Sequence, residues 1–209
     1  MKFIKENYAN FYGSNKKESS YGKPVKVVER LGELLPHGSV LDLGAGDGRH
    51  ALFLASKGLD VTAVDLSEAA LEKLQEHAKE QGLQVKTELA DLSDWSIEND
   101  YDAMVIVVTL QHLKTEDALR VLGEMKSHTK PGGLNAVSLF TKTGDRYAMD
   151  REEDPDAFYP EDGWIKDYYK DWEILTSAMR NAPIIGRTRP DGTPMENNVE
   201  VILAKKPTE

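Results

Sequence analysis

Apolar and polar residues follow two different rhythms that succeed one another from residue 39 to residue 140. Short continuous apolar runs predict buried strands, and longer stretches with an apolar residue every three or four positions predict helices. The predicted strands are 39–43, 61–64, 85–89, 101–108 and 134–140. The predicted helices are 24–35, 47–57, 67–82 and 115–128. This alternation is typical of an α/β protein, in which a parallel sheet carries helices on both faces.

The C-terminal part completes the expected fold. A short helix at 163–170 and strands at 172–178 and 198–204 bring the sheet to seven strands. We therefore expect a doubly wound, mostly parallel seven-stranded sheet in a single domain covering residues 1–209.

Three polar segments do not follow these rhythms. Residues 1–22 predict a loose, lid-like N-terminal segment, and residues 142–163 predict an irregular insertion. Glycine, proline and asparagine between 186 and 198 predict a hairpin or a loop.

Composition excludes several classes of function. The 209 residues include 26 basic and 36 acidic side chains, and the resulting net charge of -10 repels nucleic acid and anionic lipid. Because the chain has no cysteine, disulfides, thiolate nucleophiles and cysteine metal sites are excluded. The two common metal-dependent catechol patterns are not visible either, and we expect no metal. The N-terminus lacks the apolar core of a signal peptide, and the longest apolar run, 103–108, is too short to span a bilayer. We expect a cytoplasmic protein.

The segment Val40–Gly48 joins a predicted strand to a predicted helix through a turn with three glycines. This arrangement is typical of a nucleotide-type cofactor site, because glycine lets the backbone approach a ligand closely. Two residues disfavour a dinucleotide. Arg49 stands where the dinucleotide pattern needs its third glycine, and Asp42 precedes Gly44 where dehydrogenases usually carry an apolar residue.

The run Leu41–Gly58 resembles the first motif of the class I S-adenosylmethionine-dependent methyltransferases, which have a Rossmann-like fold. Acids at the ends of the next two predicted strands agree with that family. The resemblance implies that Asp42 lies near the amino acid end of the cofactor, that Asp65 binds the ribose hydroxyls and that Asp91 lies near the adenine. The implied cofactor residues are Tyr12, Asp42, Gly44, Ala45, Gly46, Arg49, Asp65, Leu66, Asp91, Leu92 and Val107.

Some of these residues also have a purely structural explanation. Asp65 could begin a helix cap, and Asp91 could be an ordinary turn acid. Asp42 is harder to explain in this way, because an unpaired carboxylate within an apolar strand costs several kcal/mol. His50 and His77 lie within predicted helices and are interpreted as ordinary surface or boundary residues.

The C-terminal third resembles the tellurite-resistance methyltransferases. The matching residues are Phe158, Tyr168, Tyr169, Trp172, Glu173, Gly186–Thr188, Gly192 and Leu203–Lys206, with Glu6–Tyr8 near the N-terminus. That family has a His-Arg pair and a later Arg in this tail. The corresponding residues here are Gly186, Arg187 and Pro194. Only Arg187 carries over, so the resemblance implies that Arg187 holds an anionic acceptor, and Arg189 is a candidate substitute for a missing cation.

Absent motifs narrow the methyl acceptor. The chain has neither an Asn/Asp-Pro-Pro-Tyr/Phe segment nor a cysteine nucleophile, which disfavours methylation of nucleic acid bases. A small molecule or small anion remains, and the resemblance implies a tellurite- or selenite-type oxyanion. The alternatives are a thiol or other small metabolite as acceptor, or a non-catalytic sensor that binds S-adenosylmethionine. The oligomeric state stays open.

The expected chemistry is an attack by an acceptor lone pair on the activated methyl group, which mainly requires alignment and exclusion of water. A selenium, tellurium or sulfur lone pair needs little help from a base. An oxygen or nitrogen acceptor needs one, and His112, after the fourth predicted strand, is the nearest candidate. The N-terminal segment and an insertion at 142–170 are expected near the active-site cleft.

Overall fold

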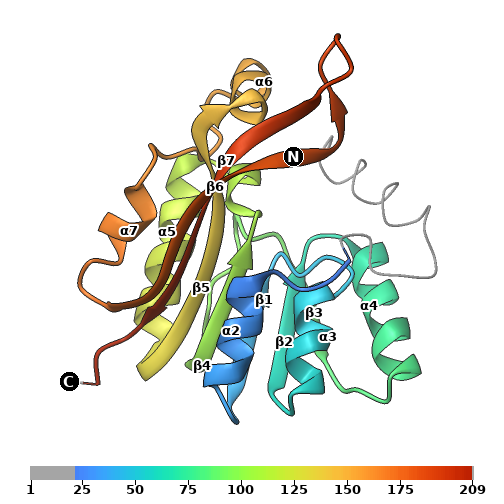
Figure 1. Ribbon diagram of the computed structural model, residues 1–209. Coiled ribbons are helices and arrows are strands. Elements are labelled where there is room, and N and C mark those ends of the chain that lie inside the picture. The colour runs from blue at the N-terminus through green and yellow to red at the C-terminus, as the bar shows by residue number, and fades with distance from the viewer. Residues whose placement is uncertain (1–21, 209) are drawn as a thin grey trace.

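The computed structural model describes residues 22–208 of the chain, and a seven-stranded sheet organises them (Figure 1). The strands are β1 (Ser39–Leu43), β2 (Asp60–Asp65), β3 (Lys86–Leu89), β4 (Tyr101–Val107), β5 (Thr129–Gly144), β6 (Glu173–Thr188) and β7 (Pro194–Lys205). Their order is β3-β2-β1-β4-β5-β7-β6. The first five strands of this order pair in parallel, and β7 pairs antiparallel with both β5 and β6. The predicted doubly wound, mostly parallel sheet is confirmed.

Helices cover both faces of the sheet. They are α2 (Lys26–Leu34), α3 (Arg49–Ser56), α4 (Glu68–Glu80), α5 (Thr115–His128), α6 (Asp145–Glu153) and α7 (Trp164–Tyr168), with a 3-10 turn η1 (Leu110–His112). The first three pack in one hydrophobic core, and α5 and α7 pack in a second core on the opposite face. Strand β4 supplies both cores from alternate positions, with Val105 in the first and Ile106 in the second, as the two-residue period of a strand requires.

The strand order reverses between β1 and β4, where the chain crosses from one half of the sheet to the other. Parallel pairing brings the carboxyl ends of β1, β2 and β4 to the same edge, with Leu43 opposite Val64 on one side and Ile106 on the other. Ligands of open α/β sheets bind in the crevice at this kind of reversal. The glycine turn after β1 lies at this edge.

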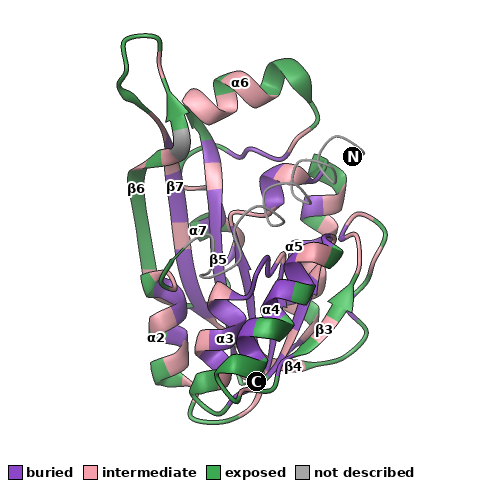
Figure 2. Ribbon diagram, turned by 90° about the vertical axis from the view of Figure 1, so that its right-hand side faces the viewer, coloured by how far each residue is buried: buried purple, intermediate pink, exposed green. Residues whose placement is uncertain are grey.

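The C-terminal strands are longer than predicted. Strand β6 runs to Thr188 and β7 starts at Pro194, so of the two structures predicted for 186–198, a hairpin or a loop, the hairpin is present, with a short turn between its strands. Figure 2 shows that β6, at the sheet edge, is largely exposed, whereas β7 beside it is largely buried. Strand β5 likewise extends beyond its predicted limits of 134–140 at both ends.

The prediction that 142–163 is irregular was wrong for α6. This helix has no buried residue, so it carries no apolar stripe from which a helix could be predicted. An Arg146–Asp150 ion pair with an N–O distance of 2.6 Å joins successive turns. A second ion pair, between Arg189 and Asp145, also at 2.6 Å, connects the start of α6 to the β6–β7 hairpin.

The predicted lid-like segment lies, except for residue 22, outside the described residues, as does Tyr12. Within residues 22–208, no helix is both long and apolar enough to cross a lipid bilayer.

Candidate active site

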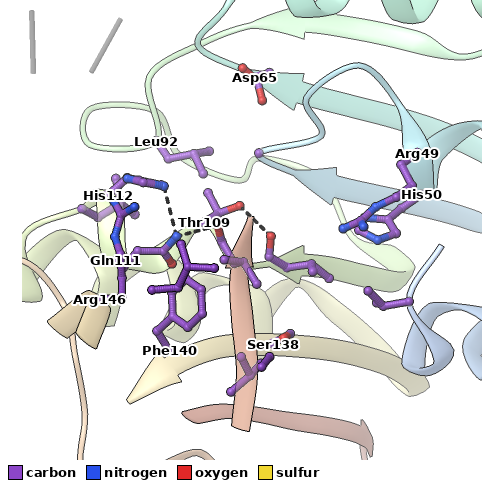
Figure 3. A pocket seen from close by; sticks show the side chains of 18 of the residues that line it. Arg49, His50, Asp65, Leu92, Thr109, Gln111, His112, Ser138, Phe140 and Arg146 are labelled. Carbon is purple, nitrogen blue, oxygen red and sulfur yellow. Dashed lines mark hydrogen bonds between the residues drawn. The ribbon is translucent and has the colours of Figure 1, made fainter. Parts of the chain in front are cut away.

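A cavity of about 360 Å³, called the central cavity below, opens at the carboxyl ends of the parallel strands. Its wall combines the glycine turn, the ends of β2, β3 and β4, the start of α3, the η1 turn, and residues of α6 and the C-terminal strands (Figure 3). Of the predicted cofactor residues, Gly44, Arg49, Asp65, Leu66, Asp91, Leu92 and Val107 line it. The structure therefore brings most of the predicted set to one place.

The Asp65 carboxylate holds the glycine turn in shape. One oxygen accepts a hydrogen bond from the Gly46 N–H at 2.8 Å, and the other accepts from the Ser67 N–H at 2.9 Å. Burial raises the pKa of Asp65, and these N–H groups oppose that rise. Each oxygen keeps a lone pair, so the carboxylate can still accept hydrogen bonds from a ligand. The structural and the binding explanation of Asp65 are thus compatible.

Glycine is required at two positions of this turn. Gly44 and Gly48 have φ values of 70° and 91°, a region that residues with a side chain rarely adopt. A Cβ atom at Gly44 would collide with Thr109, and one at Gly48 would collide with Leu74 of α4. The turn therefore packs tightly against the segment that follows β4 and against α4.

Two polar atoms near the turn are buried and lack a hydrogen-bond partner among the described residues: Asp42 Oδ2 and His50 Nε2. Burial raises the pKa of Asp42 to about 7, opposed by the Arg49 charge and by the Ala51 N–H at the start of α3. Burial also lowers the pKa of His50 to about 3, so its imidazole is neutral. Such atoms are costly in isolation and indicate a polar ligand nearby.

His50 lines the central cavity, so its interpretation as an ordinary boundary residue was wrong. Helical periodicity places a residue on a helix face but does not say what lies opposite that face. The available signal was position: His50 follows the glycine turn by two residues and lies in the first turn of α3, whose N–H groups point towards the cavity end of the helix.

The Asp91 carboxylate accepts hydrogen bonds within its own turn. Its Oδ1 accepts from the Ser93 N–H at 3.1 Å and from the Ser93 hydroxyl at 2.8 Å. Asp91 and Leu92 nevertheless both line the cavity. As with Asp65, the turn geometry leaves room for the role that the resemblance implies.

The end of β4 is strained. Val108 has a φ of 52°, the only positive φ of a non-glycine residue in the described part of the chain, and a β-branched side chain is costly there. Two hydrogen bonds hold it: its N–H donates to the Ser138 carbonyl at 2.8 Å, and its carbonyl accepts from Gln111 Nε2 at 2.7 Å. Val108 and Ser138 both line the cavity.

His112 lies in the cavity wall as a neutral imidazole. Burial is the main cause of its low pKa, about 4, and the neighbouring Arg146 charge adds to it. Gln111 Nε2 lies 3.0 Å from His112 Nε2 and also donates to the Val108 carbonyl. The amide nitrogen has a second hydrogen for the imidazole, so the Nε2 lone pair of His112 accepts that hydrogen bond. His112 is thus a weak base with an occupied lone pair.

The two tail arginines lie outside the wall of the central cavity. Arg187 is exposed on the outer part of β6 and is not part of the cavity wall. Arg189 is engaged in the hairpin, where it contacts Asp145, Thr193 and the Pro194 carbonyl. Arg146 of α6 and Arg180 of β6 line the cavity instead. The insertion at 142–170 is expected from the sequence to lie near the cleft, but no arginine within it is singled out there.

Charge is divided along the cavity. The carboxylates of Asp65 and Asp91 lie at the ends of β2 and β3, together with the Arg49 guanidinium at the start of α3. The guanidinium groups of Arg146 and Arg180 belong to the wall formed by α6 and β6. Apolar side chains, among them Val107 and Phe140, line the wall as well. The wall can hold a ligand with cationic and hydroxyl groups at one end and an anion at the other.

This fold and this site together define the class I S-adenosylmethionine-dependent methyltransferases. The family described as "Tellurite resistance protein TehB" matches residues 4–193, and the chain belongs to it.

Known proteins agree with this assignment. The chain is 30% identical over 197 residues to a probable S-adenosyl-L-methionine-dependent methyltransferase TehB of Haemophilus influenzae, covering 91% of this chain and 67% of that protein. The crystal structure of TehB from Haemophilus influenzae superposes with a TM-score of 0.74 and 26% identity, over 97% of this chain and 66% of that one. Hemagglutinin 1 of Eikenella corrodens is 32% identical over 167 residues, covering 80% of this chain and 54% of that protein. The chain thus spans between half and two-thirds of the length of these relatives.

S-adenosylmethionine, the cofactor of this class, fits the residues present. Its ammonium group would supply the missing partner of the buried Asp42 oxygen, and its carboxylate would suit the N-terminus of α3 and its unpartnered His50 nitrogen. Asp65 would hold the ribose hydroxyls, and Asp91 and Leu92 the adenine. Ala45 and Gly46 complete the turn behind these groups.

Proposed function

We propose that this protein transfers a methyl group from S-adenosylmethionine to a small anionic acceptor, and that a tellurite- or selenite-type oxyanion is the acceptor class. The observation that supports this most strongly is the division of charge along the central cavity. A cationic methyl donor is favoured beside Asp65 and Asp91, and an anionic acceptor is favoured beside Arg146 and Arg180.

The state of His112 narrows the acceptor further. A base that must remove a proton during the reaction works best with a pKa near the working pH. The pKa of His112 is about 4, and Gln111 occupies its Nε2 lone pair. An acceptor that already carries a free lone pair, such as selenite, tellurite or a thiolate, needs no such base. A phenol or an amine that must lose a proton does.

When bound, the cofactor supplies an activated methyl group on a positively charged sulfur. The protein then aligns the methyl donor with the acceptor and excludes water from both. Asp65 and Asp91 fix one end of the donor, and Val107 and Val108 form the wall where β4 ends. Phe140 adds apolar surface. Because donor and acceptor carry opposite charges, the transfer removes the sulfonium charge and lowers the negative charge of the acceptor by one, and an environment of low polarity favours it.

A direct test incubates the purified protein with S-adenosylmethionine and one of four acceptors: tellurite, selenite, a small thiol and a catechol. The readout is S-adenosylhomocysteine formed above an acceptor-free control. We expect turnover with an oxyanion and none with the catechol. Turnover with the catechol alone would contradict the proposal. Cofactor binding without turnover on any acceptor would favour the sensor alternative.

A thiolate is the second candidate acceptor, because it is also a soft anion that needs no base once ionised. The thiol reaction in the same assay separates it from the oxyanions. For either acceptor we propose a cytoplasmic enzyme without a nucleic acid partner, as the net charge of -10 and the lack of cysteine suggest.

A further inference from the structure

We propose that Arg146, braced by Asp150 and Tyr159, is the residue that anchors the anionic acceptor, in place of the tail arginine Arg187. This inference rests on the proposed function and names the residue that sets its specificity. It also gives α6, which the sequence does not predict, a direct part in substrate binding.

Arg146 is placed where it can contact a ligand in the central cavity. Arg146 lies in the first turn of α6, directly after β5 leaves the sheet, and its side chain lines the central cavity. Figure 3 shows it beside His112, and its charge acts on the His112 imidazole. The β4 end and η1, which carry Val108 and His112, form the adjoining wall. An anion held by Arg146 would therefore lie next to the end of β4.

Asp150 and Tyr159 hold the Arg146 side chain in one orientation. Its Nε donates to Asp150 Oδ2 at 2.6 Å, and the Tyr159 hydroxyl donates to the same oxygen at 2.5 Å. The Tyr159 ring contacts the Tyr147 ring of α6, with centroids 5.4 Å apart. The Arg146 side chain is 25% exposed, so this arrangement is partly shielded from water. A guanidinium held in one orientation loses less entropy on binding an anion.

Arg146 keeps N–H donors with which it can bind a ligand. Asp150 contacts Nε, the Tyr159 hydroxyl also interacts with the guanidinium, and no hydrogen bond joins either terminal amino group to a carboxylate within residues 22–208. A guanidinium offers five N–H donors in a planar fork that matches anions with charge spread over two or more oxygens. The terminal amino groups thus keep N–H donors for an oxyanion, while Asp150 fixes the base of the fork.

Other arginines of the described chain are less suited to this task. Arg187 is exposed and outside the cavity wall, and Arg189 is bound to Asp145. Arg49 lies at the glycine turn, where its charge acts on Asp42 and His50. Arg180 lines the cavity but is exposed on the edge strand β6. A partly buried and braced cation binds an anion more strongly than an exposed one, because water screens it less.

The experiment compares Arg146→Gln with Arg187→Gln, and with Arg151→Gln as a matched control. Arg151 lies on the same helix and is exposed, and its loss removes the same charge without touching the central cavity. Steady-state kinetics with selenite give the acceptor KM, and titration with S-adenosylhomocysteine gives the cofactor Kd. We expect Arg146→Gln to raise the acceptor KM at least about tenfold, as loss of a charge-assisted pair requires. Its cofactor Kd and the KM of Arg151→Gln should stay within about twofold of wild type.

Two further readouts separate anchoring from a merely structural role. Arg146→Lys keeps the charge and should recover part of the acceptor affinity that Arg146→Gln loses. Circular dichroism shows whether the Arg146→Gln protein fails to fold. In that case Arg146→Lys and Asp150→Asn replace it, and both should raise the acceptor KM. NMR titration of His112 in Arg146→Gln should show a higher pKa than in wild type, because the neighbouring positive charge is gone.

The outcomes also separate this inference from the proposed function. If wild type methylates selenite and Arg146→Gln has an unchanged KM, only the role of Arg146 is overturned. A raised KM in Arg187→Gln alone would assign the anchor to the tail. If wild type turns over no oxyanion, isothermal titration of S-adenosylhomocysteine-loaded protein with selenite decides: binding that Arg146→Gln abolishes supports the anchor, and no binding by wild type overturns it.

Discussion

The two halves of the central cavity are built in different ways. In the donor half, between β1 and β3, carboxylates are fixed by backbone N–H groups a few residues away, as Asp65 is by Ser67 and Asp91 is by Ser93. In the acceptor half, elements far apart in the sequence hold one another, as the Asp145 carboxylate of α6 accepts from Arg189 and from the Glu196 N–H of the β6–β7 hairpin. The donor half therefore depends on local turn geometry, and the acceptor half depends on the assembly of α6 and the C-terminal strands. This difference suggests that cofactor and acceptor specificity can change independently.

The largest effect is expected from Asp42→Asn in the donor half. The pKa of Asp42 rises from 3.8 to about 7 on folding, so the folded protein holds a proton that the unfolded chain releases. The raised pKa costs stability increasingly as pH rises from about 4 to 7 and fully above 7. At pH 8 the variant should be more stable in the absence of cofactor, by on the order of 4 kcal/mol, and it should bind S-adenosylhomocysteine more weakly.

Urea unfolding of the cofactor-free protein at pH 5 and pH 8 checks this prediction. The gain should be less than half as large at pH 5. Asp60→Asn is the matched control, because Asp60 is exposed at the start of the neighbouring strand β2 and forms an ion pair with exposed Lys86. An equal gain at both pH values would show that burial of the Asp42 charge is not the cause.

Asp65→Ala should weaken cofactor binding in the donor half and leave the acceptor half unchanged. The change removes the acceptors of the Gly46 and Ser67 N–H groups, so the glycine turn loses its brace. We expect the affinity for S-adenosylhomocysteine to fall about 100-fold in isothermal titration, in line with loss of charge-assisted hydrogen bonds. Asp60→Ala, on the same strand, controls for removal of a carboxylate. A loss of less than threefold would contradict the role of Asp65.

Val108→Gly tests the junction between the halves. Glycine tolerates the φ of 52° at this position, so relief of strain should outweigh its greater freedom in the unfolded chain. We expect a gain of about 1 kcal/mol and a rise in Tm of about 2–4 °C. Val105→Gly, in the buried middle of β4, should instead lower the Tm. A Tm below that of wild type for Val108→Gly would mean that the Val108 side chain stabilises the junction more than its backbone strains it.

The smallest effect is expected from His112→Asn in the acceptor half. A true general base contributes about 100-fold or more to turnover. Because the pKa of His112 is about 4, the imidazole is neutral at any pH well above that value. We expect a loss in kcat below about tenfold, and no ionisation from His112 between pH 6 and pH 8 in the wild-type profile. A wild-type inflection near pH 6.5 that the variant lacks would restore His112 as a base.

The contrast between the halves also explains what could be predicted from the sequence. The glycine turn and Asp65 were predictable because their contacts span at most about twenty residues of one strand–helix–strand unit. Arg146 was not, because a helix without an apolar stripe has no periodic signal and only the fold brings it to the cavity. Family resemblance pointed to Arg187, but the long β6 strand leaves it exposed. The roles of Arg187 and Tyr12 stay predictions.

The insertion of β7 between β5 and β6 has a consequence for synthesis of the chain. Strand β5 is made long before residues 194–205, which pair with its outer edge from Leu134 to Phe140 and again at Gly144. Until then the nascent protein exposes a long, mostly apolar strand edge, which is a template for wrong pairing with other chains. Yield from expression should therefore depend on how soon the β6–β7 hairpin closes, and its turn at 189–193 is the place where faster closure can be engineered.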